Sequence, residues 1–160
     1  MTSQSVRAAT PVALFVCIHN SARSQMAEAF ARARLGDRVD VISAGLERGT
    51  LNPIVVRAMR ERGFDLSSNT AKSLDDIDWR SRAFAYVITV CDEASAEACP
   101  AVPTTGTQLH WSFADPSRFV GTDEERLEQT RNVRDEIERA VDAWASTIGP
   151  RITVNGTERP

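Results

Sequence analysis

The feature that most constrains this chain lies between residues 12 and 30, where an apolar run, a short loop and a helical pattern follow one another. The run VALFVC is rich in β-formers and ends at Cys17, which is typical of a buried strand. Arg23 follows after five residues, and a helical pattern begins at Ser24. An oxyanion in such a loop meets backbone N–H groups, a helix N-terminus and a guanidinium fork. The same field stabilises Cys17 as a thiolate, so the pattern predicts nucleophilic chemistry on a tetrahedral oxyanion.

The rest of the chain alternates strand and helix patterns. Asn52 before Pro53 is a typical helix start, and Thr122 with Glu125 fits a capping box. Strands are predicted over 11–16, 38–43, 83–90 and 107–111, helices over 24–35, 53–63, 92–98 and 122–148, and a helical turn over 74–79.

This alternation predicts an α/β fold, a single-domain three-layer sandwich with a four-stranded parallel sheet and helices on both faces. Residues 11–148 form the domain, after a flexible leader (1–10) and before a flexible tail (149–160). Ligands of open α/β sheets bind at the carboxyl ends of the strands. Cys17 and Cys91 end two different strands in this interpretation, so both thiols are expected at one site.

Composition excludes several classes of function. The 160 residues carry a net charge of −3 and a pI near 5.4, which argues against nucleic acid as the main partner. No apolar run reaches membrane-spanning length, and the N-terminus has no signal-peptide pattern, so we expect a cytoplasmic protein. The cysteines, Cys17, Cys91 and Cys99, are odd in number and favour reduced thiols over a disulfide framework. With no CxxC or HxxxH pair, zinc is disfavoured and no metal is expected.

The spacing C-x5-R-S is weak evidence by itself, because a buried apolar Cys17 and a surface Arg23 would produce the same pattern. The position of this motif between a predicted strand and a predicted helix makes it much stronger evidence for an active-site loop. The stretch FVCIHNSARSQMAEAF closely resembles the active-site loop of low-molecular-weight protein tyrosine phosphatases, and more closely that of arsenate reductases with the same fold. The resemblance covers nearly all of 11–147 and includes the segments SAG, NPIVVRAMRERGFDLSSNTAKSL, VITVCDEASAEACP, HWSFADP and NVRDEIERAV.

The resemblance implies a role for each position of the loop. Cys17 is the nucleophile, and Arg23 clamps the oxyanion (arsenate, phosphate or sulfate). The hydroxyl of Ser24 or Ser21 donates a hydrogen bond to the thiolate. Asn20 braces the loop, where tolerance of left-handed backbone is useful. Asp115 before Pro116 is the general acid for the leaving oxygen, although an aspartate before proline is also common in turns. The oxyanion cradle consists of Cys17, Ile18, His19, Asn20, Ser21, Ala22, Arg23 and Ser24.

The two other cysteines separate the branches of this family. A phosphatase needs only Cys17, whereas arsenate reduction requires a second thiol, which Cys91 resembles. In the thioredoxin-coupled reductases a third thiol carries the disulfide to the surface, and Cys99 resembles it; otherwise Cys99 is structural. If 92–98 is helical, the two Cα atoms are roughly 12 Å apart. A disulfide needs them within about 7 Å, so this marginal helix must unwind.

The preferred hypothesis is therefore a monomeric arsenate reductase without a tightly bound cofactor, reduced by thioredoxin, glutaredoxin or a small thiol. A phosphatase is the first alternative, although Ser117 replaces the aromatic residue that tyrosine phosphatases of this fold carry after Asp-Pro. A non-catalytic oxyanion-binding or redox-sensing module is the second. Some family members bind potassium behind the loop, and Asn20, Glu28 and Ser43 match that site. Lys72 stands where another acidic ligand belongs, so weak or no potassium dependence is expected.

Overall fold

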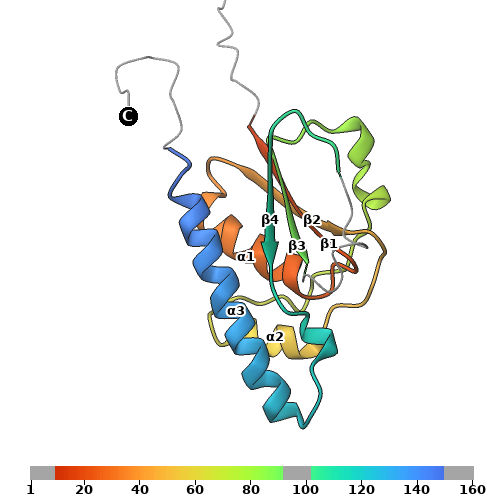
Figure 1. The fold of residues 1–160 in the computed structure, drawn as a ribbon, viewed down its shortest axis with the longest axis vertical. Coiled ribbons are helices and arrows are strands. Elements are labelled where there is room, and N and C mark those ends of the chain that lie inside the picture. The colour runs from red at the N-terminus through yellow and green to blue at the C-terminus, as the bar shows by residue number, and fades with distance from the viewer. Residues whose placement is uncertain (1–9, 92–101, 150–160) are drawn as a thin grey trace, which may run out of the picture.

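The computed structural model describes residues 10–91 and 102–149 and contains one parallel sheet in the order β2-β1-β3-β4 (Figure 1). The strands are β1 (Val12–Cys17), β2 (Asp40–Gly45), β3 (Tyr86–Cys91) and β4 (Thr107–Ser112). The α-helices are α1 (Arg23–Leu35), α2 (Pro53–Arg60) and α3 (Asp123–Ala145). Short 3-10 turns follow at η1 (Asp75–Ile77), η2 (Trp79–Ser81) and η4 (Pro116–Arg118). The predicted leader, most of the tail and the segment 92–101 lie outside the described residues.

The strand order places a switch point beside Cys17. The chain leaves β1 through α1 to β2 on one side, and later returns to pair β3 with the other side of β1. Ligand sites of open parallel sheets occur where the connections diverge in this way, at the carboxyl ends of the strands. Val16 pairs with Thr89, so Cys91 ends the neighbouring strand at the same edge of the sheet. The predicted four-stranded α/β fold is confirmed.

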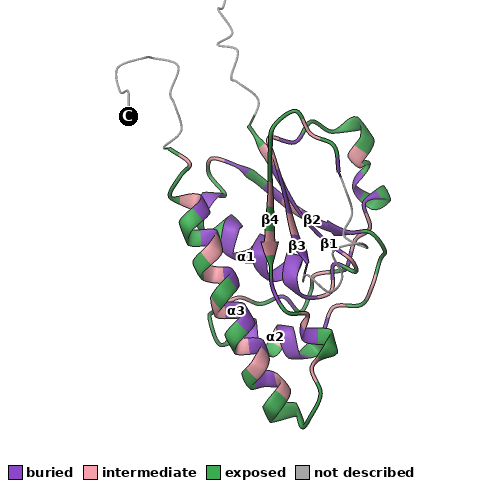
Figure 2. Ribbon diagram, viewed as in Figure 1, coloured by how far each residue is buried: buried purple, intermediate pink, exposed green. Residues whose placement is uncertain are grey.

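The sheet separates two hydrophobic clusters. One face packs against all three α-helices, with Phe15, Met26 and Ile137 among its fully buried residues. On the opposite face, Leu74 and Ile77 cover the sheet from the segment around the 3-10 turns. Among the described residues this second layer therefore consists of short turns rather than a long helix, and Figure 1 shows these turns on the side of the strands away from α3. Figure 2 shows that α1 is buried along most of its length, whereas α3 alternates buried and exposed positions.

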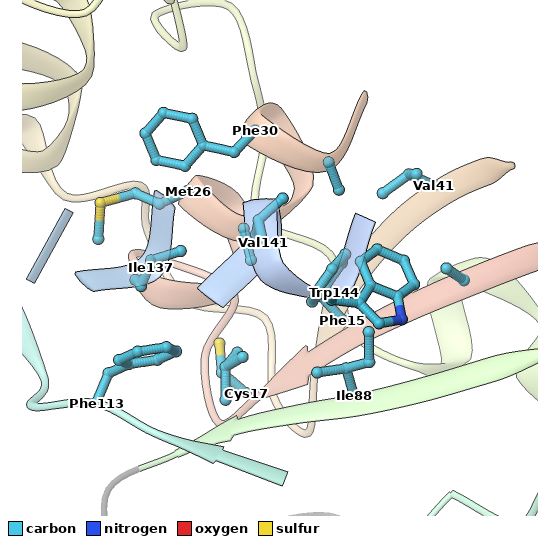
Figure 3. Packing of buried hydrophobic residues seen from close by; sticks show 14 of the residues in the cluster. Phe15, Cys17, Met26, Phe30, Val41, Ile88, Phe113, Ile137, Val141 and Trp144 are labelled. Carbon is cyan, nitrogen blue, oxygen red and sulfur yellow. The ribbon is translucent and has the colours of Figure 1, made fainter. Parts of the chain in front are cut away.

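An aromatic cluster fixes α3 to the sheet. The ring of Trp144 lies 5.7 Å from that of Phe15, 5.3 Å from that of Tyr86 and 6.2 Å from that of Trp111, each in an edge-to-face arrangement. Such geometry is favourable beyond the burial of area alone. Figure 3 shows the Trp144 and Phe15 side chains next to each other in the hydrophobic core, with Cys17 and Phe113 farther toward the carboxyl ends of the strands. The single tyrosine of the chain is therefore a partly buried residue that packs against the core.

The main differences from the predicted boundaries occur at strand ends. β2 begins at Asp40 instead of Arg38, and β3 begins at Tyr86 instead of Ala83. At their carboxyl ends β1 and β2 pair Cys17 with Gly45, in agreement with the expected ends of both strands. Both predicted helix caps are present: the Asn52 side chain accepts from the N–H of Ile54, and Thr122 forms the complete capping box. No helix within the described ranges is long and apolar enough to cross a membrane.

Candidate active site

Cys17 lies at the end of β1 with its sulfur inside the following loop. The residue is 3% exposed, and its Sγ atom is 2.8 Å from the Ser24 hydroxyl oxygen and 3.1 Å from the Asn20 backbone nitrogen, which donates to it. The Ser24 oxygen also accepts a hydrogen bond from Asn20 Nδ2, which leaves the single hydroxyl proton for the sulfur. Ser24, and not Ser21, is therefore the hydroxyl at the thiol. Both donors favour a charged sulfur.

The carbonyl groups of the loop point away from its centre. Each carbonyl from Cys17 to Ser21 accepts a hydrogen bond from a donor outside the cradle. In chain order these donors are Leu46 N, Glu47 N, Gly49 N, the Gln25 side chain and Asn52 N. In a trans peptide the next N–H points opposite to the carbonyl, and the described residues contain no cis peptide bond. The N–H groups of 18–22 therefore point inward, as that of Asn20 does toward the sulfur.

The start of α1 supplies further donors to this concave surface. Ala22 is the N-cap and has no side-chain hydrogen bond, and the first turn of α1 contains no acidic residue. Helix N-termini normally satisfy their free N–H groups with a capping side chain or a ligand. A loop with inward N–H groups that ends in an uncapped helix start is a suitable oxyanion-binding site.

Gly45 allows the loop to lie against the end of β2. A Cβ atom at this position would lie 2.7 Å from the Ile18 carbonyl oxygen and 2.7 Å from the Asn20 nitrogen. Both are backbone atoms of the cradle and have no freedom to move aside. Any larger residue at 45 would displace the loop, which explains the glycine after the predicted strand.

Asn20 connects the loop to three surrounding segments. It is fully buried with a left-handed φ of 54°. Its Nδ2 atom donates to Ser24 at 2.8 Å and to Ser43 at 2.9 Å. Its Oδ1 atom accepts from Gln25 at 2.9 Å and from the backbone of Lys72 at 2.9 Å. All hydrogen-bonding positions of the amide are used, so Asn20 fixes the loop in one conformation.

Arg23 joins the loop to the segment that carries Asp115. Arg23 is 3% exposed. Its Nη1 atom donates a hydrogen bond to the Phe113 carbonyl at 3.2 Å, and its Nη2 atom lies 3.3 Å from Asp115 Oδ2. These contacts use two of the five guanidinium protons, so a fork remains for an oxyanion. The structure thus brings together Cys17, Arg23, Ser24 and Asp115, which sequence reasoning had placed at one site.

Behind the loop lies a buried carboxylate. Glu28 is 4% exposed, and burial raises its pKa, although the charges of Lys72 and Arg32 and a hydrogen bond from Ser43 act in the opposite direction. The Ser43 hydroxyl therefore connects Glu28 to Asn20. Because the positive charge of Lys72 acts on Glu28, these residues do not fit a potassium ion at this place. Within the described ranges, no group of three or more acidic, histidine or cysteine residues is arranged to hold a metal ion.

The remaining predicted residues lie at the end of β3, at the rim of the loop or outside the described ranges. Cys91 ends β3, is fully buried and is disulfide-bonded, whereas Cys17 is a free thiol. Cys99 and the predicted helix over 92–98 lie outside the described residues. His19 points toward Glu47 at the exposed rim, with a separation of 3.5 Å between Nε2 and Oε2.

Sequence reasoning missed three supporting residues. Gln25 is fully buried and bonds to Asn20 and to the Thr70 carbonyl, although its polarity predicts a surface position on α1. The backbone carbonyl of Phe113 holds Arg23, which no side-chain pattern can indicate. Ser117 bonds to Asp115.

Comparison with known proteins agrees with this geometry. Residues 12–153 match the family described as low molecular weight phosphotyrosine protein phosphatase. The arsenate reductase of Halalkalibacterium halodurans is 43% identical over 136 residues, covering 85% of this chain and 96% of the relative.

Two solved structures extend the comparison. An arsenate reductase in the phosphate-binding state aligns with a TM-score of 0.69 and 28% identity, covering 87% of this chain and 99% of the other. The thioredoxin-dependent arsenate reductase of Corynebacterium glutamicum aligns with a TM-score of 0.57 and 30% identity, over 87% of this chain and 65% of the other. The chain therefore belongs to the low molecular weight phosphotyrosine protein phosphatase family and is similar to its arsenate reductases.

Proposed function

We propose that this protein is an arsenate reductase. The observation that carries the proposal is the Cys17 sulfur in a loop of inward N–H groups, with the Ser24 hydroxyl beside it and with Arg23, from the same loop, held against Asp115. Arsenate and phosphate share the tetrahedral shape and charge that this cradle fits. The similarity to reductases over most of the chain selects arsenate as the substrate.

The first step is nucleophilic substitution at arsenic. The Cys17 thiolate forms a sulfur–arsenic bond while one arsenic–oxygen bond breaks, and Arg23 with the loop N–H groups neutralises the charge. Asp115 donates a proton to the departing oxygen, which leaves as water when it already carries one proton. Asp115 is within reach because its Oδ2 atom lies 3.3 Å from the guanidinium that binds the oxyanion.

The second step reduces arsenic. Once thioredoxin has reduced the disulfide that Cys91 forms in this structure, the Cys91 thiolate attacks the Cys17 sulfur. A disulfide forms between them, and the electron pair of the sulfur–arsenic bond leaves with arsenic as arsenite. Cys99 then displaces Cys17, and thioredoxin reduces the resulting Cys91–Cys99 disulfide. Support comes from the position of Cys91 at the same sheet edge as Cys17 and from the thioredoxin dependence of the similar Corynebacterium protein. Glutaredoxin or a small thiol is the competing donor.

Hydrolysis of phosphate esters is a second candidate activity. It needs only Cys17, Arg23 and Asp115, and the contacts of Cys17 with Ser24 and of Arg23 with Asp115 support it. Ser117 follows Asp115-Pro116, so the aromatic wall expected for a phosphotyrosine ring is missing at this position. We therefore expect slow hydrolysis of small esters beside arsenate reduction.

The further expectations concern the state of the protein in the cell. Three cysteines that act as thiols require a reducing compartment, which supports a cytoplasmic location. A monomer is expected, to be checked by analytical ultracentrifugation. Because Lys72 supplies a positive charge near Glu28, arsenate turnover should be the same in sodium and potassium buffers.

The decisive experiment is arsenate-dependent NADPH oxidation with thioredoxin and thioredoxin reductase, with arsenate added last. Cys17→Ser should abolish all activity, and Cys91→Ser should abolish arsenite release but retain ester hydrolysis. Arg23→Lys keeps the charge but loses the fork, and should lower turnover by about 100-fold or more. The control is Arg57→Lys, because the Arg57 side chain is 48% exposed and pairs with Glu124 on the surface. Thioredoxin-dependent arsenite release by Cys91→Ser would refute the relay.

A further inference from the structure

The two carboxylate oxygens of Asp115 have different surroundings. Oδ1 accepts two hydrogen bonds from Ser117, from its N–H at 3.0 Å and from its hydroxyl at 2.6 Å. Oδ2 faces the guanidinium of Arg23, with Nη2 at 3.3 Å. The Asp115 side chain is 15% exposed, so it is held in a defined position at the edge of the site.

The backbone explains why Ser117 provides both contacts. Asp115 is the N-cap of the turn η4, and Pro116 has no N–H, so the first backbone donor available to the carboxylate is that of residue 117. A backbone donor is present with any residue except proline. The hydroxyl is the particular contribution of serine.

We propose that Ser117 is a positioning residue that assigns different tasks to the two oxygens of Asp115. Each carboxylate oxygen has about two acceptor positions, and Ser117 fills both of those on Oδ1. The acidic proton is therefore placed on Oδ2, which is the oxygen that faces Arg23. This inference rests on the proposed function, in which Asp115 is the general acid.

The arrangement directs the proton toward the substrate. An oxyanion held by the Arg23 fork has an oxygen close to the same nitrogen that contacts Oδ2. In the first step the proton on Oδ2 moves to the departing oxygen, the arsenic–oxygen bond breaks, and the carboxylate that remains is stabilised by Arg23 and Ser117. Without the hydroxyl, Oδ1 has a free acceptor position, and the carboxyl group can rotate or carry its proton away from the substrate.

Ser117→Ala is expected to lower the single-turnover rate of arsenate reduction about 5- to 10-fold, with KM for arsenate changed less than twofold. The loss is a fraction of the 10²–10⁴ of general acid catalysis, because the N–H of residue 117 remains and water replaces part of the lost bond. Ser117→Thr retains a hydroxyl and should restore most of the rate.

A matched control comes from the other side of the sheet. Ser81 donates its hydroxyl to the Asp78 carboxylate at 2.6 Å, in an exposed turn away from the site. Ser81→Ala therefore removes the same kind of bond and should leave the turnover rate unchanged. Comparing the melting temperatures of both variants separates a loss of stability from a loss of positioning.

A double-mutant cycle provides the decisive readout. If Ser117 acts only through Asp115, Ser117→Ala should have no effect on turnover in an Asp115→Asn background. The inference is overturned if Ser117→Ala lowers the turnover rate equally in the parent protein and in Asp115→Asn, or if it does not lower the rate in the parent protein. Other results would refute the proposed function itself: full activity in Asp115→Asn, or any remaining activity in Cys17→Ser. A reduced rate in Asp115→Asn with a normal rate in Ser117→Ala refutes the role of Ser117 alone.

Discussion

The loop that surrounds Cys17 should depend on Asn20 more than on any other uncharged side chain. Replacement of Asn20 by alanine removes four hydrogen bonds, those to Ser24, Ser43, Gln25 and the Lys72 backbone. A buried hydrogen bond contributes about 1 kcal/mol net, so the side chain contributes about 4 kcal/mol. Water that enters the vacated space recovers part of this amount.

The backbone of Asn20 adds a second contribution. Its φ of 54° is left-handed, a conformation that costs alanine about 1 kcal/mol more than glycine. We expect the free energy of unfolding to fall by about 3–5 kcal/mol in Asn20→Ala. Asn20→Gly should lose about 1 kcal/mol less, because it removes the same side chain without the backbone strain. The difference between these two variants measures the backbone term directly.

Urea denaturation followed by tryptophan fluorescence is a suitable assay, because Trp144 and Trp111 report on the core. Asn132→Ala is the control: Asn132 is exposed on α3, and alanine there should change stability by no more than about 0.5 kcal/mol. A loss below about 1 kcal/mol in Asn20→Ala would show that the loop holds its conformation without this side chain, and the reasoning would be refuted.

Ser24→Ala should slow alkylation of Cys17 by iodoacetamide at pH 7 about tenfold, since a hydrogen bond to a charged sulfur contributes about 1.5 kcal/mol or more. Gly45→Ala should abolish thermal stabilisation by phosphate, because its Cβ would lie 2.7 Å from two backbone atoms of the loop. A hydrogen bond from Arg131 helps to lower the pKa of Glu61 from 4.5 to about 2, so Glu61→Gln should destabilise the fold at pH 7. The stabilisation is complete above pH 4.5 and is lost as the pH falls through 2, where the two unfolding curves should meet. Because the Glu61 side chain is 38% exposed, solvent screening limits the contribution of its ion pair to stability to about 1 kcal/mol.

Two of these variants have a matched control elsewhere in the chain. Gly149→Ala should have no effect on phosphate binding, because nothing lies within 4 Å of a Cβ there. Glu124→Gln should leave acid stability nearly unchanged, since that carboxylate is 75% exposed. Unchanged alkylation in Ser24→Ala would mean that the hydroxyl does not stabilise the thiolate, and a Glu61→Gln difference that persists below pH 2 would exclude the ion pair as its cause.

Local sequence patterns were sufficient to predict the strand–loop–helix unit. The apolar run before Cys17, the spacing to Arg23 and the caps at Asn52 and Thr122 are encoded within a few residues of one another. The α/β class and the place of the thiol at a sheet edge followed from these patterns, because parallel strands need helical crossovers and expose their carboxyl ends together.

Contacts between distant segments could not be predicted in this way. Three such contacts join residues up to 92 positions apart. Gln25 donates to the Thr70 carbonyl from a buried position, Arg23 donates to the Phe113 carbonyl, and Asp115 lies against the same guanidinium.

The sequence by itself determined that a nucleophilic thiol follows a buried strand and precedes an arginine at a helix start. Only the tertiary structure decided which hydroxyl meets that thiol, which way the loop carbonyls turn, and which oxygen of Asp115 faces the oxyanion site. The reason is physical: the type of each local element follows from neighbours along the chain, whereas the direction of a donor or acceptor is fixed by partners that only folding brings within hydrogen-bonding distance.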